Sequence, residues 1–195
     1  MMEGEVPMSQ GDIPFDLSFH FNAELRDVPN RPEEMQAAVV WLAERVGDLA
    51  LDERRRAQLA GMLVVCARML HDYPAALAAA QTALALADRL GDARLALVNQ
   101  ARLAHVYQWQ GDFARSNALF GKLLDACATN PDLASYRDSI CQHAGKNLFD
   151  QGRYAEAAAL FEEALALREQ RGNAELIASA QLALRVTRER LDQHP

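Results

Sequence analysis

Histidine and carboxylate side chains carry most acid–base and metal chemistry, and in this chain they form no recognisable set. His105 and His143 lie 38 residues apart, with no third ligand at helical spacing, whereas zinc sites use three or four protein ligands. Glu162 and Glu163 follow Phe161 in an apolar pattern of helical period, which is typical of a solvent-facing helix surface. We therefore expect no metal site and no catalytic carboxylate pair.

Motifs for nucleophilic and phosphate chemistry are also missing. The chain contains no Gly-rich phosphate loop, no H-E-x-x-H and no C-x-x-C pair. Cys66, Cys127 and Cys141 are widely spaced within helical patterns, which indicates small buried side chains in a reducing compartment. The sequence thus predicts a protein that is not an enzyme and that needs no cofactor.

The composition favours helices and excludes several kinds of partner. Half of the 195 residues are apolar and only 7% are aromatic, while Ala and Leu make up about a third, which predicts helices packed through small side chains. The net charge of −7 argues against a nucleic-acid partner, because phosphate binding needs clustered Lys and Arg. No apolar run of 18 residues and no signal-like N-terminus occurs, so we expect a cytoplasmic protein without a membrane partner.

Two short patterns recur along the chain with a common period of about 40 residues. One ends in Gly-Asp or Gly-Asn, and the other ends in an aromatic residue two positions after Gly or His. The copies are LAERVGD at 42–48, LADRLGD at 86–92 and LREQRGN at 167–173, with HDY at 71–73, GDF at 111–113 and GRY at 152–154. Two interleaved turn signals per period indicate two helices per unit.

Between these turns, apolar residues recur at three- and four-residue spacing, which is a helical period. The predicted helices lie at about 32–46, 52–70, 74–90, 93–110, 113–128, 132–150, 154–171 and 174–191. Pro32 and Pro74 fall in first turns, where the missing N–H costs nothing. The fold class that we expect is all-α, an array of about eight helices in antiparallel pairs.

Small and aromatic residues recur at fixed places around each turn and in the second helix of each pair. A small residue at a helix crossing permits close approach, and an aromatic ring fills the space beside it. We assign this packing role to Gly111, Phe113, Phe120, Gly145, Gly152, Tyr154, Ala157, Phe161 and Ala164. The first pair departs from the pattern, with His71 in place of glycine and Ala80 in place of an aromatic residue.

These residues resemble the tetratricopeptide repeat family, in a variant of about 40–42 residues that is similar to the arrays of kinesin light chains and bacterial regulators. The resemblance covers about residues 32–192 and is strongest in the unit that starts near Asp132. It implies a right-handed superhelical α-solenoid. It also implies that the first helix of each pair lines a concave face, which binds an extended or helical peptide.

The expected concave face carries basic, amide and apolar side chains and few carboxylates. The candidates are Arg68, Met69, Arg102, His105, Gln108, Trp109, Gln142, His143 and Lys146. Such a face suits an acidic peptide, with Arg102 and Lys146 as charge partners and Trp109 as an apolar anchor; a solvated face without a ligand is the alternative. The two-Lys, Asn-rich clamp of the chaperone-binding members is missing, so chaperone C-termini are not expected as partners.

Charge divides the chain into an N-terminal arm, residues 1–31, and a repeat domain, residues 32–195. Residues 1–34 hold eight carboxylates and two arginines, whereas residues 35–195 hold 19 acidic and 18 basic side chains. Nearly all of the negative charge therefore lies in and beside the arm.

Apolar residues alternate with polar ones in the arm, at Phe15, Leu17, Phe19 and Phe21. Period two predicts an extended segment with one apolar face, and the rest of the chain offers no strand that would pair with it. Three alternatives remain open: the arm caps the first helices, occupies the groove of its own chain or of a homodimer partner, or is disordered.

Together these features predict a scaffold or adaptor that binds a protein or peptide segment. A regulatory sensor that responds to a signal peptide, or that associates with itself through the arm, is the alternative function.

Overall fold

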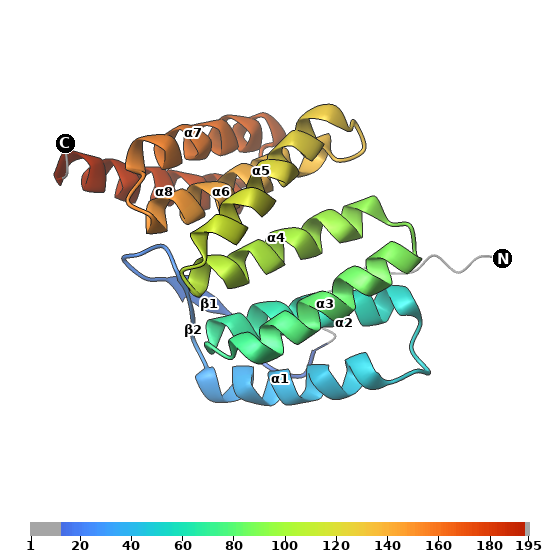
Figure 1. Cartoon of the computed structure of the whole chain (residues 1–195). Coiled ribbons are helices and arrows are strands. Elements are labelled where there is room, and N and C mark those ends of the chain that lie inside the picture. The colour runs from blue at the N-terminus through green and yellow to red at the C-terminus, as the bar shows by residue number, and fades with distance from the viewer. Residues whose placement is uncertain (1–12, 194–195) are drawn as a thin grey trace.

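The computed structural model describes residues 13–193, and its helices stack side by side in chain order (Figure 1). Within these residues the α-helices are α1 (Pro32–Gly47), α2 (Glu53–Met69), α3 (Tyr73–Arg89), α4 (Ala93–Trp109), α5 (Phe113–Thr129), α6 (Arg137–Asp150), α7 (Tyr154–Arg171) and α8 (Ala174–Gln193). The all-α class and the eight predicted helices are confirmed. Glu3, Glu5 and Asp12 of the arm lie outside the described residues.

One helix begins later than the sequence pattern predicts. The segment expected at 132–150 opens with a 3-10 turn, η2 (Ala134–Tyr136), and α6 starts only at Arg137. Asn130 causes the delay, because its side chain accepts a hydrogen bond from the Asp132 N–H while its carbonyl accepts one from the Leu133 N–H. This local turn competes with helix formation.

Most turns between helices place one residue in the left-handed region. These residues are His71, Gly91, Gly111, Gly152 and Gly172, with φ between 61° and 77°. His71 therefore adopts the conformation of the glycines that it replaces, at a cost of roughly 1 kcal/mol. The aspartates that follow cap the next helix by accepting a backbone N–H, as seen at Asp72, Asp92 and Asp112.

The closest helix approach occurs where a glycine faces an aromatic ring. Gly145 of α6 lies so near Phe161 of α7 that an added Cβ would be 2.6 Å from the ring. Phe161, Ala157 and Ala164 are fully buried in this contact. Its counterpart in the preceding pair joins the buried Ala104 and Phe120.

Gly111 and Gly152 do not have the packing role that the sequence pattern suggested. A Cβ at either position would meet no atom within 4 Å, and both residues have positive φ. They serve the backbone conformation of the turn. Tyr154 does pack, with its ring 5.2 Å from that of Phe149, and Phe113 is partly buried at the start of α5.

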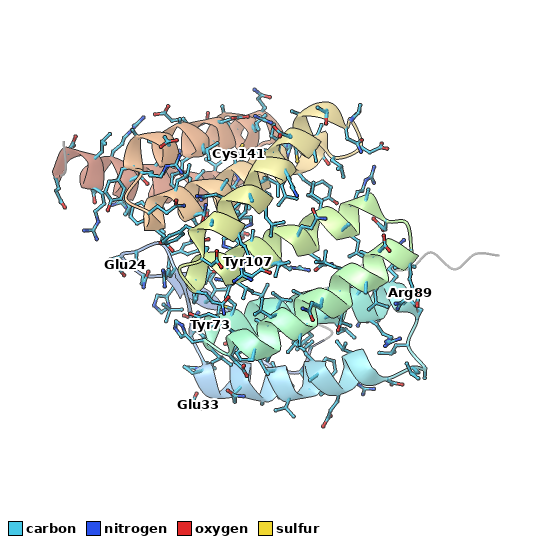
Figure 2. All side chains as sticks on the ribbon, viewed as in Figure 1. Glu24, Glu33, Tyr73, Arg89, Tyr107 and Cys141 are labelled. Carbon is cyan, nitrogen blue, oxygen red and sulfur yellow. The ribbon has the colours of Figure 1, made fainter. Side chains whose placement is uncertain are left out.

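Each pair packs on the next, so that the first helices lie next to one another. Helices α2 and α3, α4 and α5, and α6 and α7 are in contact within pairs, while α2 touches α4 and α4 touches α6 along the stack. Side chains fill the space between neighbouring ribbons, and Tyr73 and Arg89 mark the two ends of α3 (Figure 2). We name the face formed by the first helices the α2–α4–α6 surface.

The arm folds into a short hairpin of its own. Strand β1 (Phe19–Phe21) pairs antiparallel with β2 (Asp27–Pro29), with His20 opposite Val28. The expectation that the chain has no strand for this segment is therefore wrong. The Asn22 side chain builds the connecting loop by accepting the N–H groups of Glu24 and Arg26.

The arm joins the two ends of the helix stack. Ile13 and Leu17 are buried in the cluster formed with α1, α2 and α3, whereas Leu25, at the hairpin loop, is 3% exposed and belongs to the cluster of α6, α7 and α8. In Figure 1 the hairpin lies beside the first helices and extends toward α6 and α8. Among the residues that the structure describes, none of the helices has the length and apolar character of a membrane span.

The Gly145–Phe161 contact can be tested against a matched glycine. We expect Gly145→Ala to lower the free energy of unfolding by about 1–3 kcal/mol, because the methyl group overpacks a fixed ring. Gly121→Ala is the control: Gly121 is exposed inside α5 with no atom within 4 Å of an added Cβ, so this change should stabilise by about 0.5–1 kcal/mol. Urea denaturation measures both, and equal effects would contradict the packing assignment.

Candidate functional site

A carboxylate of the hairpin lies between two cations of the α2–α4–α6 surface. Asp27 accepts hydrogen bonds from Arg68 Nη2 of α2 at 2.6 Å and from Lys146 Nζ of α6 at 3.2 Å. The three side chains are only 14%, 6% and 10% exposed, respectively. Because buried charges are stable only when paired, one aspartate accounts for the burial of both cations.

Aromatic rings cover the same cations. The guanidinium of Arg68 stacks over Trp109 at 4.3 Å from the ring centroid, and Lys146 Nζ lies 3.8 Å from the centroid of Phe21 in β1. Arg26 of the hairpin covers Trp109 as well, at 5.3 Å. Desolvated cation–π contacts of this kind add to the ion pairs.

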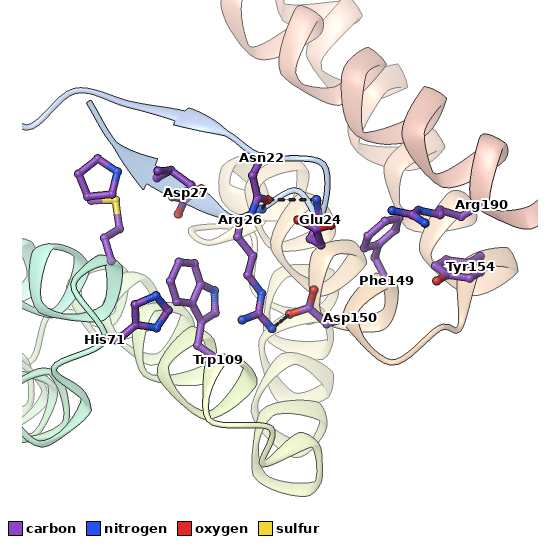
Figure 3. A pocket seen from close by; sticks show the side chains of 13 residues that line it. Asn22, Glu24, Arg26, Asp27, His71, Trp109, Phe149, Asp150, Tyr154 and Arg190 are labelled. Carbon is purple, nitrogen blue, oxygen red and sulfur yellow. Dashed lines mark hydrogen bonds and ion pairs between the residues drawn. The ribbon is translucent and has the colours of Figure 1, made fainter. Parts of the chain in front are cut away.

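A second ion pair fastens the hairpin to the end of α6 (Figure 3). Arg26 Nη2 donates to Asp150 Oδ2 at 2.9 Å, and Gln108 Nε2 donates to the same oxygen at 3.0 Å. Gln108 Oε1 lies 2.8 Å from His105 Nδ1. The orientation of the Gln108 amide therefore makes His105 Nδ1 the protonated nitrogen of a neutral ring.

His105 and His143 lie against each other beneath the α2–α4–α6 surface. Their rings pack edge to face at 4.5 Å. Burial, reinforced by nearby positive charge, lowers the pKa of both, that of His143 to about 3. Among the described residues, no group of three potential ligands is placed to hold a metal ion.

The remaining candidates of the expected concave face lie in different surroundings. Met69 is buried in the cluster of α1, α2 and α3. Gln142 accepts a hydrogen bond from Arg168 of α7 and is directed to that contact. Arg102 lies next to open space and bonds only to Asn99 within the described residues. The structure thus brings Arg68, Trp109 and Lys146 together beneath the hairpin.

The hairpin lies across the α2–α4–α6 surface and leaves a cavity on each side. One, of about 570 Å³, includes Arg26, Trp109 and Asp150 in its lining. The other, of about 270 Å³, includes Phe21 and Lys146. Asp27 lines both cavities, so its carboxylate marks the place where the hairpin crosses the surface.

Comparison with known proteins matches one of the helix pairs. A family model of the tetratricopeptide repeat covers residues 139–171, which span most of α6, all of α7 and the Gly145–Phe161 contact. This match, together with the stacked helix pairs, supports a tetratricopeptide repeat assignment for residues 139–171. No curated protein matches the chain.

Of the arm residues that contact the α2–α4–α6 surface, the sequence pattern named Phe21, as part of an apolar alternation, but neither Arg26 nor Asp27. Asp27, Arg26 and Phe21 make the central contacts, yet nothing distinguishes Asp27 from the other carboxylates of residues 1–34. The available signal was the alternation of Phe19 and Phe21 followed by Asn22, because asparagine favours the turn of a hairpin.

Replacing Asp27 tests whether it holds the hairpin on the repeat domain. Asp27→Asn leaves Arg68 and Lys146 buried without a carboxylate, a cost of roughly 3–5 kcal/mol, so we expect the hairpin to undock. The backbone amides of the β1–β2 pair should then exchange hydrogen faster. Glu24→Gln, a change of an exposed carboxylate in the same hairpin, should exchange at the wild-type rate; equal rates for all three proteins would refute the role of Asp27.

Acid should release the hairpin in the same way. Burial raises the pKa of Asp27, but Lys146 and Arg68 together outweigh this effect and hold the pKa below its usual 3.8. A carboxyl with a lowered pKa stabilises the docked state above its undocked pKa, and this stability is lost as the pH falls through the lowered value. Trp109 fluorescence should therefore change below about pH 4 in wild type. In Asp27→Asn this component should be missing.

Proposed function

We propose that the protein is a non-enzymatic scaffold that binds an extended protein segment on the α2–α4–α6 surface. The tetratricopeptide repeat is in general a protein-interaction unit. The position of Asp27 between Arg68 and Lys146 supports binding at this place on the surface. A segment that delivers a carboxylate and an aromatic ring to this place meets matching groups.

The contacts of the hairpin indicate the chemistry of the partner. Its backbone is extended, Asp27 supplies the negative charge, and Phe21 supplies the ring that faces Lys146. The fit is therefore to an acidic segment with an aromatic residue nearby. The groups that a partner would contact are Arg68, Trp109 and Lys146, and a partner must displace the hairpin to reach them.

The arm competes with any partner for the α2–α4–α6 surface. A segment tethered directly before α1 has an effective concentration of the order of millimolar, so a partner must bind tightly or the arm must be loosened first. The three cysteines are buried and unpaired, which suits the reducing cytoplasm that we propose as its compartment.

A synthetic peptide of residues 13–31 tests the proposal in trans. We expect it to bind the full-length Asp27→Asn protein at least about ten times more tightly than wild type, since the weakened arm no longer competes. Fluorescence anisotropy of the labelled peptide measures both affinities.

Two controls distinguish binding at this site from nonspecific binding of the peptide. The same peptide carrying asparagine at position 27 should fail to bind, and Lys146→Met in the Asp27→Asn background should abolish binding of the natural peptide. If all pairs bind alike, the surface is not a site for acidic segments. Analytical ultracentrifugation of the wild type checks the alternative in which two copies exchange arms, because exchange produces a homodimer held by these contacts.

A further inference from the structure

A part of the α2–α4–α6 surface stays open beside the hairpin. The cavity of about 270 Å³ adjoins a second one of about 430 Å³, and both are lined by Val98, Arg102 and Tyr136. Arg102 thus lines both cavities.

Arg102 differs from the other cations around these cavities. Arg54 pairs with Asp92, and Arg68 and Lys146 share Asp27, whereas Arg102 has no carboxylate partner among the residues that the structure describes. Its one hydrogen bond goes to the neutral Asn99 side chain at 2.9 Å. Burial lowers its pKa to about 10, a mark of a cation that pays for desolvation without compensation.

The charge of the smaller cavity is unbalanced as a whole. Its lining holds three cations, Arg68, Arg102 and Lys146, against the single carboxylate of Asp27. The two histidines in the lining are neutral, since burial lowers the pKa of both. A group that brings negative charge is therefore favoured there.

Helix α2 makes room for the guanidinium. A Cβ at Gly61 would overlap Arg102 and lie 2.5 Å from Asn99 Oδ1, so any other residue would displace the arginine from its place. A glycine inside a helix costs roughly 1 kcal/mol relative to alanine. At Gly61 the missing side chain leaves the space that the Arg102 guanidinium occupies.

The walls around this charge are apolar. The cavity is lined by Val65, Leu97, Val98, Ala101 and Ile140 of the helices. Phe19 and Phe21 of the hairpin close one side, and Phe19 remains 41% exposed although it is large and apolar. An apolar body in the cavity would cover the exposed ring.

We propose that this cavity binds a small organic carboxylate with an apolar aliphatic or aromatic body, with its carboxylate on Arg102. The volume lies just below the range of about 300–1,000 Å³ typical of drug-sized ligands, so the acid is small. The guanidinium offers the forked donors that a carboxylate prefers, and the aliphatic walls receive the body. Since the hairpin provides two of the walls, the bound acid also holds the hairpin in place.

Octanoate and 3-phenylpropionate are suitable probes, and 1-octanol and octylamine are matched molecules without the carboxylate. We expect both acids to bind the full-length protein, as measured by calorimetry, and octanol and octylamine to bind at least about tenfold more weakly. Saturating octanoate should also slow tryptic cleavage after Arg26, because the occupied cavity retains the hairpin.

Variants separate the site from unspecific adsorption. Arg102→Gln should weaken octanoate binding at least about tenfold. Arg185→Gln, which makes the same change in charge at an exposed arginine of α8 outside the linings of both cavities, should leave it unchanged. In wild type, octanoate should shift the amide resonances of Val98, Ala101 and Ile140, a readout that needs no variant to fold. Equal binding of octanol, unchanged affinity in Arg102→Gln, shifts confined to other surfaces, or binding of acidic peptides here but not of the acids would each overturn the proposal.

Discussion

The sharing of one carboxylate by two buried cations is the constraint on which the arrangement of this protein depends. Arg68 and Lys146 come from different helix pairs, and their charges would repel each other without Asp27. With Asp27 in place, they are buried under the hairpin and covered by Trp109 and Phe21. This contact places the arm across the surface, and Asp27 lies between the two cavities that the arm leaves open.

The helices and their turns were predictable from the sequence because their causes are local and repeated. Left-handed residues, capping aspartates and small residues at crossings recur with the period of the helix pairs, and each acts within a few residues or on the next helix. His71 shows that the context of the pair determines the turn even where glycine is missing. Only the start of α6 differed, because Asn130 forms a turn that apolar periodicity does not register.

The site was predictable only in part, because its decisive contacts join distant segments. Arg68, Trp109 and Lys146 were found from their places in the repeat, whereas Asp27 lies 119 residues from Lys146 in the chain. Nothing in the repeat could select one carboxylate of the arm. Composition suggested an acidic arm beside a basic face, and the hairpin register decides which acid meets which base.

A stack of helix pairs in which each pair touches only its neighbours unfolds from either end, one unit at a time. The arm changes this behaviour, because Leu17 is anchored in the first cluster and Leu25 in the last. Loosening α8 exposes the Leu25 anchor, and loss of that anchor weakens the cover over α2. The two ends of the stack are therefore linked through the arm, and we expect the chain to unfold as one cooperative unit.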